Sequence, residues 1–220
     1  MSNLADRLLT YGNEFGAESS FLAINPSDGL GIASKEAPTA YSATAGLLSV
    51  YNSELQDAPT GTNGAIHVWP DKLSLTATQH NTGASGLRFV GMLDKPGASR
   101  WSSGGTALTS NQRYRTKRSG YVERTAKAQI YFGDLTLTAE TDADCVFDEM
   151  VSNDVLAIND VIELCFGGGG PKSFTSGVYS IPIQAFTIAP GCTLTIHPVS
   201  LLQTQDAAFT VSFYTFEWGF

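Results

Sequence analysis

The sequence predicts an all-β protein in which two antiparallel sheets pack face to face as a sandwich. From Ala65 onward, segments rich in β-branched and aromatic residues are separated by clusters of Gly, Pro, Asn and Asp. Several of these segments, such as TLTIHP, alternate apolar and polar residues, which is typical of a strand that covers a core with one face. The hydrophobic fraction of 42% is ample for such a core.

The first dozen residues predict the one clear helix of the chain. Leu4, Leu8 and Leu9 share one helical face, and Gly12 can end the helix. Residues 25–64 are rich in Pro, Gly, Ser, Thr and Ala and predict long loops around LLSVYNSELQ, which fits either a short helix or a strand. We therefore expect one domain, in which residues 1–64 supply a short N-terminal helix and loops that pack on a main β-sandwich of residues 65–220.

The remaining elements follow from the same patterns. The expected strands are AIHVW, LSLTAT, LRFVGML, AQIYFGDLTLTA, VLAINDVIELCF, VYSIPIQAFTIA, TLTIHPVSLL and AAFTVSFYTFEW. TDADCVFDEMVSND is ambiguous, because the spacing of Phe147, Met150 and Val151 fits a brief helix. About eight strands with many long connections favour a Greek-key sandwich of the jelly-roll form, whereas an up-and-down barrel would have shorter and more even loops.

The run CFGGGGPKSF contains four glycines before a lysine and a serine, so we compared it with the glycine-rich loops that bind phosphate. A P-loop needs a glycine directly before its lysine and a helix directly after it. Pro171 occupies that position and has no N–H to offer, and the following SFTSGVYSIPIQ is rich in β-branched and aromatic residues. The four glycines therefore predict a flexible connection between two strands.

No motif in the sequence indicates an enzyme, and we predict no catalytic residue, no metal site and no cofactor. The three cysteines are widely spaced and predict reduced core residues rather than a zinc site (Cys145, Cys165 and Cys192). His67 and His197 lie within strand patterns without HxH or HExxH spacing, so we expect surface or half-buried side chains. The start of the chain does not resemble a signal peptide, and no run of about 18 apolar residues predicts a membrane helix.

A carbohydrate-binding or glycoside-hydrolysing sandwich is the alternative from a different functional class. Glu163 and Glu217 lie within strand patterns, and paired carboxylates are the catalytic groups of most glycosidases. Glu217 is flanked by aromatic residues, and Trp69, Trp101 and Trp218 are candidate sugar-stacking side chains. A glutamate on the outward face of an aromatic strand is the more ordinary interpretation.

The distribution of charge is the most informative functional feature. Charged residues are only 15% of the chain, and its net charge is −8. Residues 88–127 carry nine cations and two carboxylates, a local charge of +7, which leaves −15 on the remainder. Residues 134–163 carry nine carboxylates and no lysine or arginine. Sparse charges that are sorted by sign favour contact with other copies of the same chain.

The centre of the basic block, NQRYRTKRSGYVER, is the candidate interaction segment. Arg113, Arg115 and Lys117 would project from one face of an extended chain, with Arg118 beside them. Three partners fit such a segment: nucleic acid, lipid headgroups, or the acidic segment of a neighbouring subunit. We favour the neighbouring subunit, because an acidic chain without a basic tail is a poor general binder of nucleic acid. Pairing of the two blocks within one molecule is the simpler alternative.

The acidic counterpart is expected in Asp142, Asp144, Asp148 and Glu149. These carboxylates also offer oxygen ligands for Ca²⁺, although the spacing of an EF-hand loop is broken. We expect an ordinary acidic segment, with Ca²⁺ as the alternative.

In style, the strand-rich region resembles the single jelly-roll coat proteins of icosahedral viruses and tailless phages. The resemblance is carried by AQIYFGDLTLTAE, VLAINDVIELCF, YSIPIQAFTIAPGCTLTIHP and AFTVSFYTFEWGF, about two-thirds of the chain, and by no diagnostic motif. It implies a non-enzymatic capsid subunit, located in the virion, that self-assembles with copies of itself and with other capsid subunits. A spike or receptor-binding component of a virion is a further alternative.

One departure from that family affects the expected partners. Many coat proteins of RNA viruses begin with an arm rich in Arg and Lys, whereas this chain begins with a nearly neutral segment. The resemblance then implies a shell that lies over an internal membrane, or contact with the genome through another part of the protein. No small-molecule substrate is expected.

Overall fold

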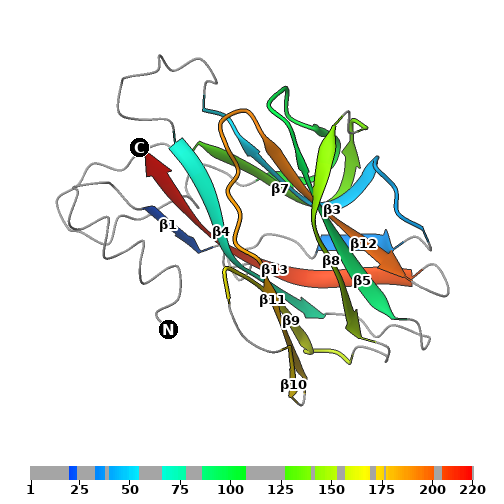
Figure 1. Cartoon of the computed structure of the whole chain (residues 1–220). Coiled ribbons are helices and arrows are strands. Elements are labelled where there is room, and N and C mark those ends of the chain that lie inside the picture. The colour runs from blue at the N-terminus through cyan, green and yellow to red at the C-terminus, as the bar shows by residue number, and fades with distance from the viewer. Residues whose placement is uncertain are drawn as a thin grey trace.

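The computed structural model describes residues 20–23, 33–37, 40–54, 66–77, 86–107, 127–139, 142–152, 157–168, 172–175, 177–200 and 205–219. Their regular structure consists of strands in two sheets, which confirms the predicted all-β class (Figure 1). The predicted N-terminal helix lies outside the described residues. Within these ranges, no helix is long and apolar enough to cross a membrane.

The first sheet, called sheet A, has seven strands. Their spatial order is β1 (Ser20–Ala23), β13 (Gln205–Gly219), β4 (Ile66–Ala77), β9 (Val161–Phe166), β11 (Val178–Ile183) and β10 (Ser173–Thr175), with β2 (Ala33–Ala37) also beside β13. The β9–β11 pair is parallel, and the other pairs of this sheet are antiparallel.

The second sheet, called sheet B, has six strands that all pair antiparallel. Their spatial order is β6 (Trp101–Ala107), β7 (Ala128–Leu137), β3 (Ala45–Asn52), β12 (Thr193–Ser200), β5 (Leu87–Asp94) and β8 (Ala143–Ser152). LLSVYNSELQ therefore contributes a central strand, β3. β1 and β2, which also precede residue 64, pair with β13 in sheet A.

The core lies between the two sheets and follows the period of two that the sequence predicts. In β9, for example, Ile162, Leu164 and Phe166 are buried, whereas the residues between them are half-buried. Aromatic contacts join the sheets: the rings of Phe89 (β5) and Phe209 (β13) have centroids 6.2 Å apart. Fully burying side chains of this kind stabilises the fold by about 1.5–3 kcal/mol each.

β12 departs from this pattern because it is buried on both faces. Leu194 and Ile196 belong to the core between the sheets, yet Thr193, Thr195 and His197 on the opposite face are also at most 1% exposed. The expectation that His197 is a surface or half-buried residue is therefore wrong, whereas His67 is half-buried as expected. A strand of sheet B that looks half-buried from its alternation is covered by a second layer of chain.

The glycine run connects β9 to β10, which confirms the prediction of a connection between two strands. β11 lies between these two strands, so the chain passes the end of β11 before it forms β10. Gly167 has a φ of 80° and its N–H donates to the Ile183 carbonyl at the end of β11, 2.9 Å away. The positive φ explains the need for glycine at this turn.

Within the ambiguous segment TDADCVFDEMVSND, Ala143–Ser152 form the strand β8 and not a brief helix. β8 pairs with β5, and its register shifts leave Val146 and Val151 as extra residues. Each extra residue reverses the alternation of sides, which places Phe147 and Val151 in the core and leaves Met150 43% exposed. Spacings of three and four residues, typical of a helix, arise here from a bulged strand.

Candidate functional site

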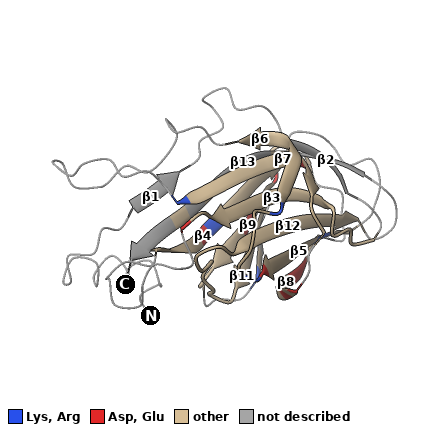
Figure 2. Ribbon diagram, turned by 90° about the horizontal axis from the view of Figure 1, so that it is seen from above, with Lys and Arg blue, Asp and Glu red and all other residues tan. Residues whose placement is uncertain are grey.

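The four acidic residues of the candidate interface lie together at the edge of sheet B. Asp142 immediately precedes β8, and Asp144, Asp148 and Glu149 lie within it. Figure 2 shows acidic positions, in red, at β8, whereas most of the coloured ribbon around it is uncharged. Asp142, Asp144 and Asp148 are exposed, and Glu149 is half-buried. The predicted acidic segment is thus an accessible edge strand.

Three of these carboxylates form ion pairs within the same molecule. Lys95 donates to Asp142, Arg88 donates through two nitrogens to Asp148, and Lys172 donates to Glu149. The hydrogen bonds between Arg88 and Asp148 lower the pKa of the carboxyl and raise the pKa of the guanidinium. The pKa of Lys95 is raised by its hydrogen bond to Asp142 and, more weakly, by the nearby charges of Asp142, Asp144 and Asp94.

Ion pairing extends to every lysine and arginine whose side chain the structure describes. Besides the three pairs at β8, Lys72 pairs with Glu163 at 2.9 Å and Lys127 with Glu54 at 3.2 Å. The sixth pair, Arg100 with Asp94 at 3.7 Å, is the most deeply buried. The cations of the described sandwich are therefore neutralised by carboxylates of the same chain.

The basic half of the candidate interface lies outside the described residues: Arg113, Arg115, Lys117 and Arg118 all fall between β6 and β7. The two ends of this connection are described. β6 and β7 pair with each other at the edge of sheet B opposite β8. The ends of the basic connection and the acidic strand thus lie at opposite edges of one sheet.

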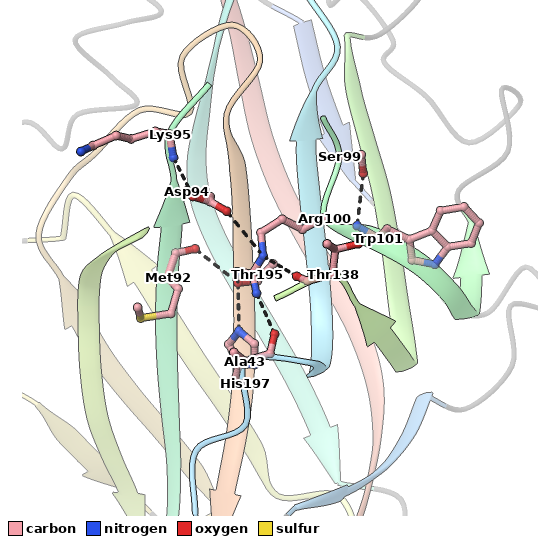
Figure 3. Close-up of polar contacts among 10 residues, drawn as sticks. All are labelled: Ala43, Met92, Asp94, Lys95, Ser99, Arg100, Trp101, Thr138, Thr195 and His197. Carbon is pink, nitrogen blue, oxygen red and sulfur yellow. Dashed lines mark hydrogen bonds and ion pairs between the residues drawn. The ribbon is translucent and has the colours of Figure 1, made fainter. Parts of the chain in front are cut away.

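A buried polar cluster on the outer face of sheet B was not predicted. Arg100, which is 3% exposed, donates from Nη1 to Thr195 Oγ1 at 2.9 Å and from Nη2 to the Ala43 carbonyl at 2.7 Å. Its Nε donates to the Thr138 carbonyl at 3.1 Å. Figure 3 shows the guanidinium surrounded by these groups and by Asp94. One side chain therefore links β12 to three other parts of the chain.

His197 extends this cluster along β12. Its Nδ1 lies 2.7 Å from the Ala45 carbonyl and its Nε2 lies 2.9 Å from Thr195 Oγ1. Because a carbonyl can only accept, Nδ1 carries a proton. The imidazole ring also packs edge-on against the Tyr41 ring, with centroids 4.9 Å apart. A hydroxyl beside an imidazole is an arrangement that nucleophilic enzymes use. Thr195 and His197 are each at most 1% exposed, however, so this pair connects strands and does not face a substrate.

No sequence signal indicated this cluster. Thr193, Thr195 and His197 alternate with apolar residues, which normally indicates a solvent-facing side. Thr195 is contacted by Arg100, which is distant in the sequence and was counted with the basic block.

The glutamates of the carbohydrate alternative are not brought together. Glu163 pairs in register with Ser74 of β4, and Glu217 pairs with Val68 of the same strand. Six residues along a strand correspond to about 20 Å, whereas the carboxyl groups of glycosidases lie about 5–9.5 Å apart. Glu163 moreover pairs with Lys72. This register does not form a glycosidase pair.

The other candidate residues are dispersed. Trp69 lies on sheet A and Trp101 on sheet B, where the Trp101 ring stacks on Tyr131 with centroids 4.0 Å apart. The three cysteines are free, but the prediction of three core residues holds for Cys192 alone: Cys145 is exposed on β8, and Cys165 is half-buried on β9 outside the core. Among the described residues, no group of three His, Cys, Asp or Glu side chains could hold a metal ion.

No protein family model matches this chain, and neither a curated protein nor a solved structure matches it.

Proposed function

We propose that the sandwich is a jelly roll and that the protein is a self-assembling capsid subunit of a virion. The strand pairing carries this proposal. Without the insertions β6–β7 and β10–β11, eight strand positions remain along the chain, with β1 and β2 sharing the first. The first position pairs with the eighth (β13), β3 with β12, β4 with β9, and β5 with β8.

This nested pairing is that of one long hairpin wrapped into two facing sheets, which supports the jelly-roll form. The two insertions each widen one sheet at an edge: β7 and β6 extend sheet B beyond β3, and β11 and β10 extend sheet A beyond β9. They leave the nested order of the other strands intact. Jelly rolls recur in viral capsid, lectin and cupin domains, so the fold narrows the function without naming it.

Capsid assembly is the favoured function because of the surface. Charged residues are only 15% of the chain, and the described lysines and arginines are paired with carboxylates of the same molecule. Such a surface suits close packing of identical copies. The lectin or glycosidase alternative is compatible with the same fold, but Glu163 and Glu217 no longer support it because they are not brought together. A virion spike shares the same fold and differs in copy number.

Light scattering coupled to size-exclusion chromatography, with electron microscopy of the same fractions, tests the proposal. We expect large closed particles at low ionic strength that give way to smaller species between about 0.1 M and 1 M salt, where the Debye length shrinks from about 10 Å to about 3 Å. A monomer at every salt and protein concentration would contradict the proposal. A glycan array run in parallel would favour the lectin alternative if the monomer binds a defined sugar.

A further inference from the structure

The connection from β5 to β6, residues 95–100, crosses the outer face of sheet B and is called the strap. β5 and β6 are separated by β12, β3 and β7, so the strap covers four strand spacings, or about 19 Å, across the strands alone. It also runs along the strands, because Asp94 is level with Gln129 of β7 and Trp101 with Leu137. The seven residue steps from Asp94 to Trp101 reach at most about 25 Å. The strap therefore has little slack, and it cannot pack as a compact loop of its own.

The contacts that hold this strap against the sheet are polar, and they begin with the exposed ion pair of Lys95 with Asp142 beside β8. The N–H of Gly97 donates to the Gly191 carbonyl at 2.9 Å, and the Tyr51 hydroxyl donates to the Gly97 carbonyl at 3.3 Å. Residues 95–98 are exposed, and Ser99 is half-buried. Arg100 is the one buried residue of the strap, and its carbonyl also accepts from the Thr138 N–H at 2.7 Å. The attachment of the strap thus depends mainly on Arg100.

The face beneath the strap is polar, although it is buried. Ser49 on β3 lies opposite Thr195 on β12, and Thr193 precedes it on the same face; each is at most 1% exposed. Ser49 Oγ is buried without a hydrogen-bond partner. A buried hydroxyl in that state is unfavourable, and contact with water would satisfy it. A face that is built to stay covered is normally apolar, as Leu194 and Ile196 are on the other side of β12.

From these features we propose that the strap is a clasp, meaning a segment that detaches locally from sheet B while the sandwich stays folded. Arg100 is its latch, the residue that holds the strap in place. Opening breaks the bonds of Gly97 and Arg100 and exposes the hydroxyl-lined face of β3 and β12. It leaves the core between the sheets covered, because that core lies on the opposite side of both strands. This device is independent of the proposed assembly function, and its test requires no assembled particle.

Amide hydrogen exchange of the full-length chain, followed by NMR across low concentrations of urea, tests the clasp. The reporters are the N–H groups of Gly97 and Thr138, which bond across the strap; the references are those of Val68 and Ala77, which bond within sheet A to the Ile188 and Asp160 carbonyls. We expect the strap amides to exchange at least tenfold faster than the references and with little dependence on urea. Equal exchange rates with equal urea dependence would overturn the proposal, because the strap would then open only on global unfolding.

Two variants test the latch. In Arg100→Gln, exchange at Gly97 and Thr138 should accelerate at least tenfold, while Val68 and Ala77 change far less. Tyr51→Phe removes one strap hydrogen bond without touching the buried charge, and it should accelerate the Gly97 amide by roughly two- to tenfold. Ala98→Ser, at an exposed strap position, is the matched control and should leave all four rates unchanged.

Should Arg100→Gln fail to fold, the Tyr51→Phe variant and the wild-type urea series still decide the matter. If Tyr51→Phe accelerates strap and reference amides by the same factor, the strap is part of the global folding unit and the clasp is excluded. Acceleration confined to the strap amides supports it.

Discussion

Gly91 of β5 permits an aromatic ring to pack directly on the backbone of sheet B. It is the register partner of Phe147 in β8, and a Cβ built on it would lie 2.1 Å from Cε1 of that ring. Phe147 is 6% exposed and its ring contacts Phe166 of the other sheet at a centroid distance of 5.8 Å. The smallest residue in β5 thus allows the edge strand β8 to contribute to the core.

Gly91→Ala should therefore destabilise the fold by about 1–3 kcal/mol, because the added methyl group displaces a buried ring that has no free space. Phe147→Leu alone should also destabilise it. The double variant should be more stable than the sum of the two changes predicts, since the smaller side chain makes room for the methyl group. Urea unfolding of the four proteins measures this coupling, and strictly additive effects would show that the ring and the glycine do not interact.

His67 of β4 is the residue for which the structure predicts a pH effect near neutrality. Partial burial lowers the pKa of its imidazole from 6.5, because the charged form is less well solvated in the folded protein. The unfolded chain then takes up a proton at a higher pH than the folded chain. The contribution of His67 to stability is present above pH 6.5 and is lost as the pH falls toward the lowered pKa.

Wild-type protein should consequently lose more unfolding free energy than His67→Gln when the pH is lowered from about 7.5 to about 5.5, a range in which histidine is the main titrating side chain. Urea unfolding at both pH values gives the difference between the two proteins. A decline of equal size in wild type and variant would exclude His67 as its source.

At the scale of elements, alternation of apolar and polar residues identifies some strands directly. β9 and β12 are recognisable because their side chains alternate strictly, and the burial of Ile162, Leu164 and Leu194 follows from that pattern. β8 is not recognisable, because its two extra residues break the period of two. Bulges depend on pairing with another strand, which a single sequence does not display.

The candidate site illustrates the same limit. The acidic strand is evident from composition, but its pairing with Arg88, Lys95 and Lys172 depends on which strands are neighbours. Likewise, the partner of Thr195 is Arg100, which lies in a connection that crosses other strands, and the partners of His197 include Tyr41 and Ala45. Local patterns predict which residues form strands, and long-range topology decides which polar groups meet.

The edges of both sheets are poorly suited to adding a strand from another molecule. In sheet A, the edge strands β1, β2 and β10 have only four, five and three residues. In sheet B, the pairings of β6 and β8 contain register shifts, and Gly104 and Gly105 of β6 have φ values of 78° and 65°. Short or bulged edges resist edge-to-edge pairing. Assembly of this fold should therefore use faces and connections rather than continuous sheets.

At the scale of the whole molecule, the intramolecular ion pairs change what charge can contribute to assembly. The four carboxylates of the acidic strand sum to −4, and Arg88, Lys95 and Lys172 reduce this to −1. These pairs are exposed to solvent, where water and salt screen them, so each contributes little to stability. A basic segment from a neighbouring subunit can therefore replace the internal partners at little cost, but it meets a strand that is already largely neutral.

Two sets of charge variants should therefore have opposite effects on assembly. Replacing Arg113, Arg115 and Lys117 together by Glu should abolish assembly and leave the unfolding free energy of the subunit within about 1 kcal/mol of wild type. Replacing Arg88, Lys95 and Lys172 together by Gln should instead strengthen assembly, because it restores the charge of the acidic strand from −1 to −4.

Light scattering across a salt series measures both effects as a shift of the assembly midpoint. If the acidic strand is the counterpart of the basic segment, the glutamine set assembles at higher salt than wild type, and the glutamate set stays monomeric throughout. Should the glutamate set fail to assemble while the glutamine set behaves as wild type, the basic segment contacts a different anionic partner, such as genome phosphate or lipid headgroups. Should both sets assemble as wild type, contacts between uncharged faces alone hold the subunits together. Salt would then not act on assembly by screening charges.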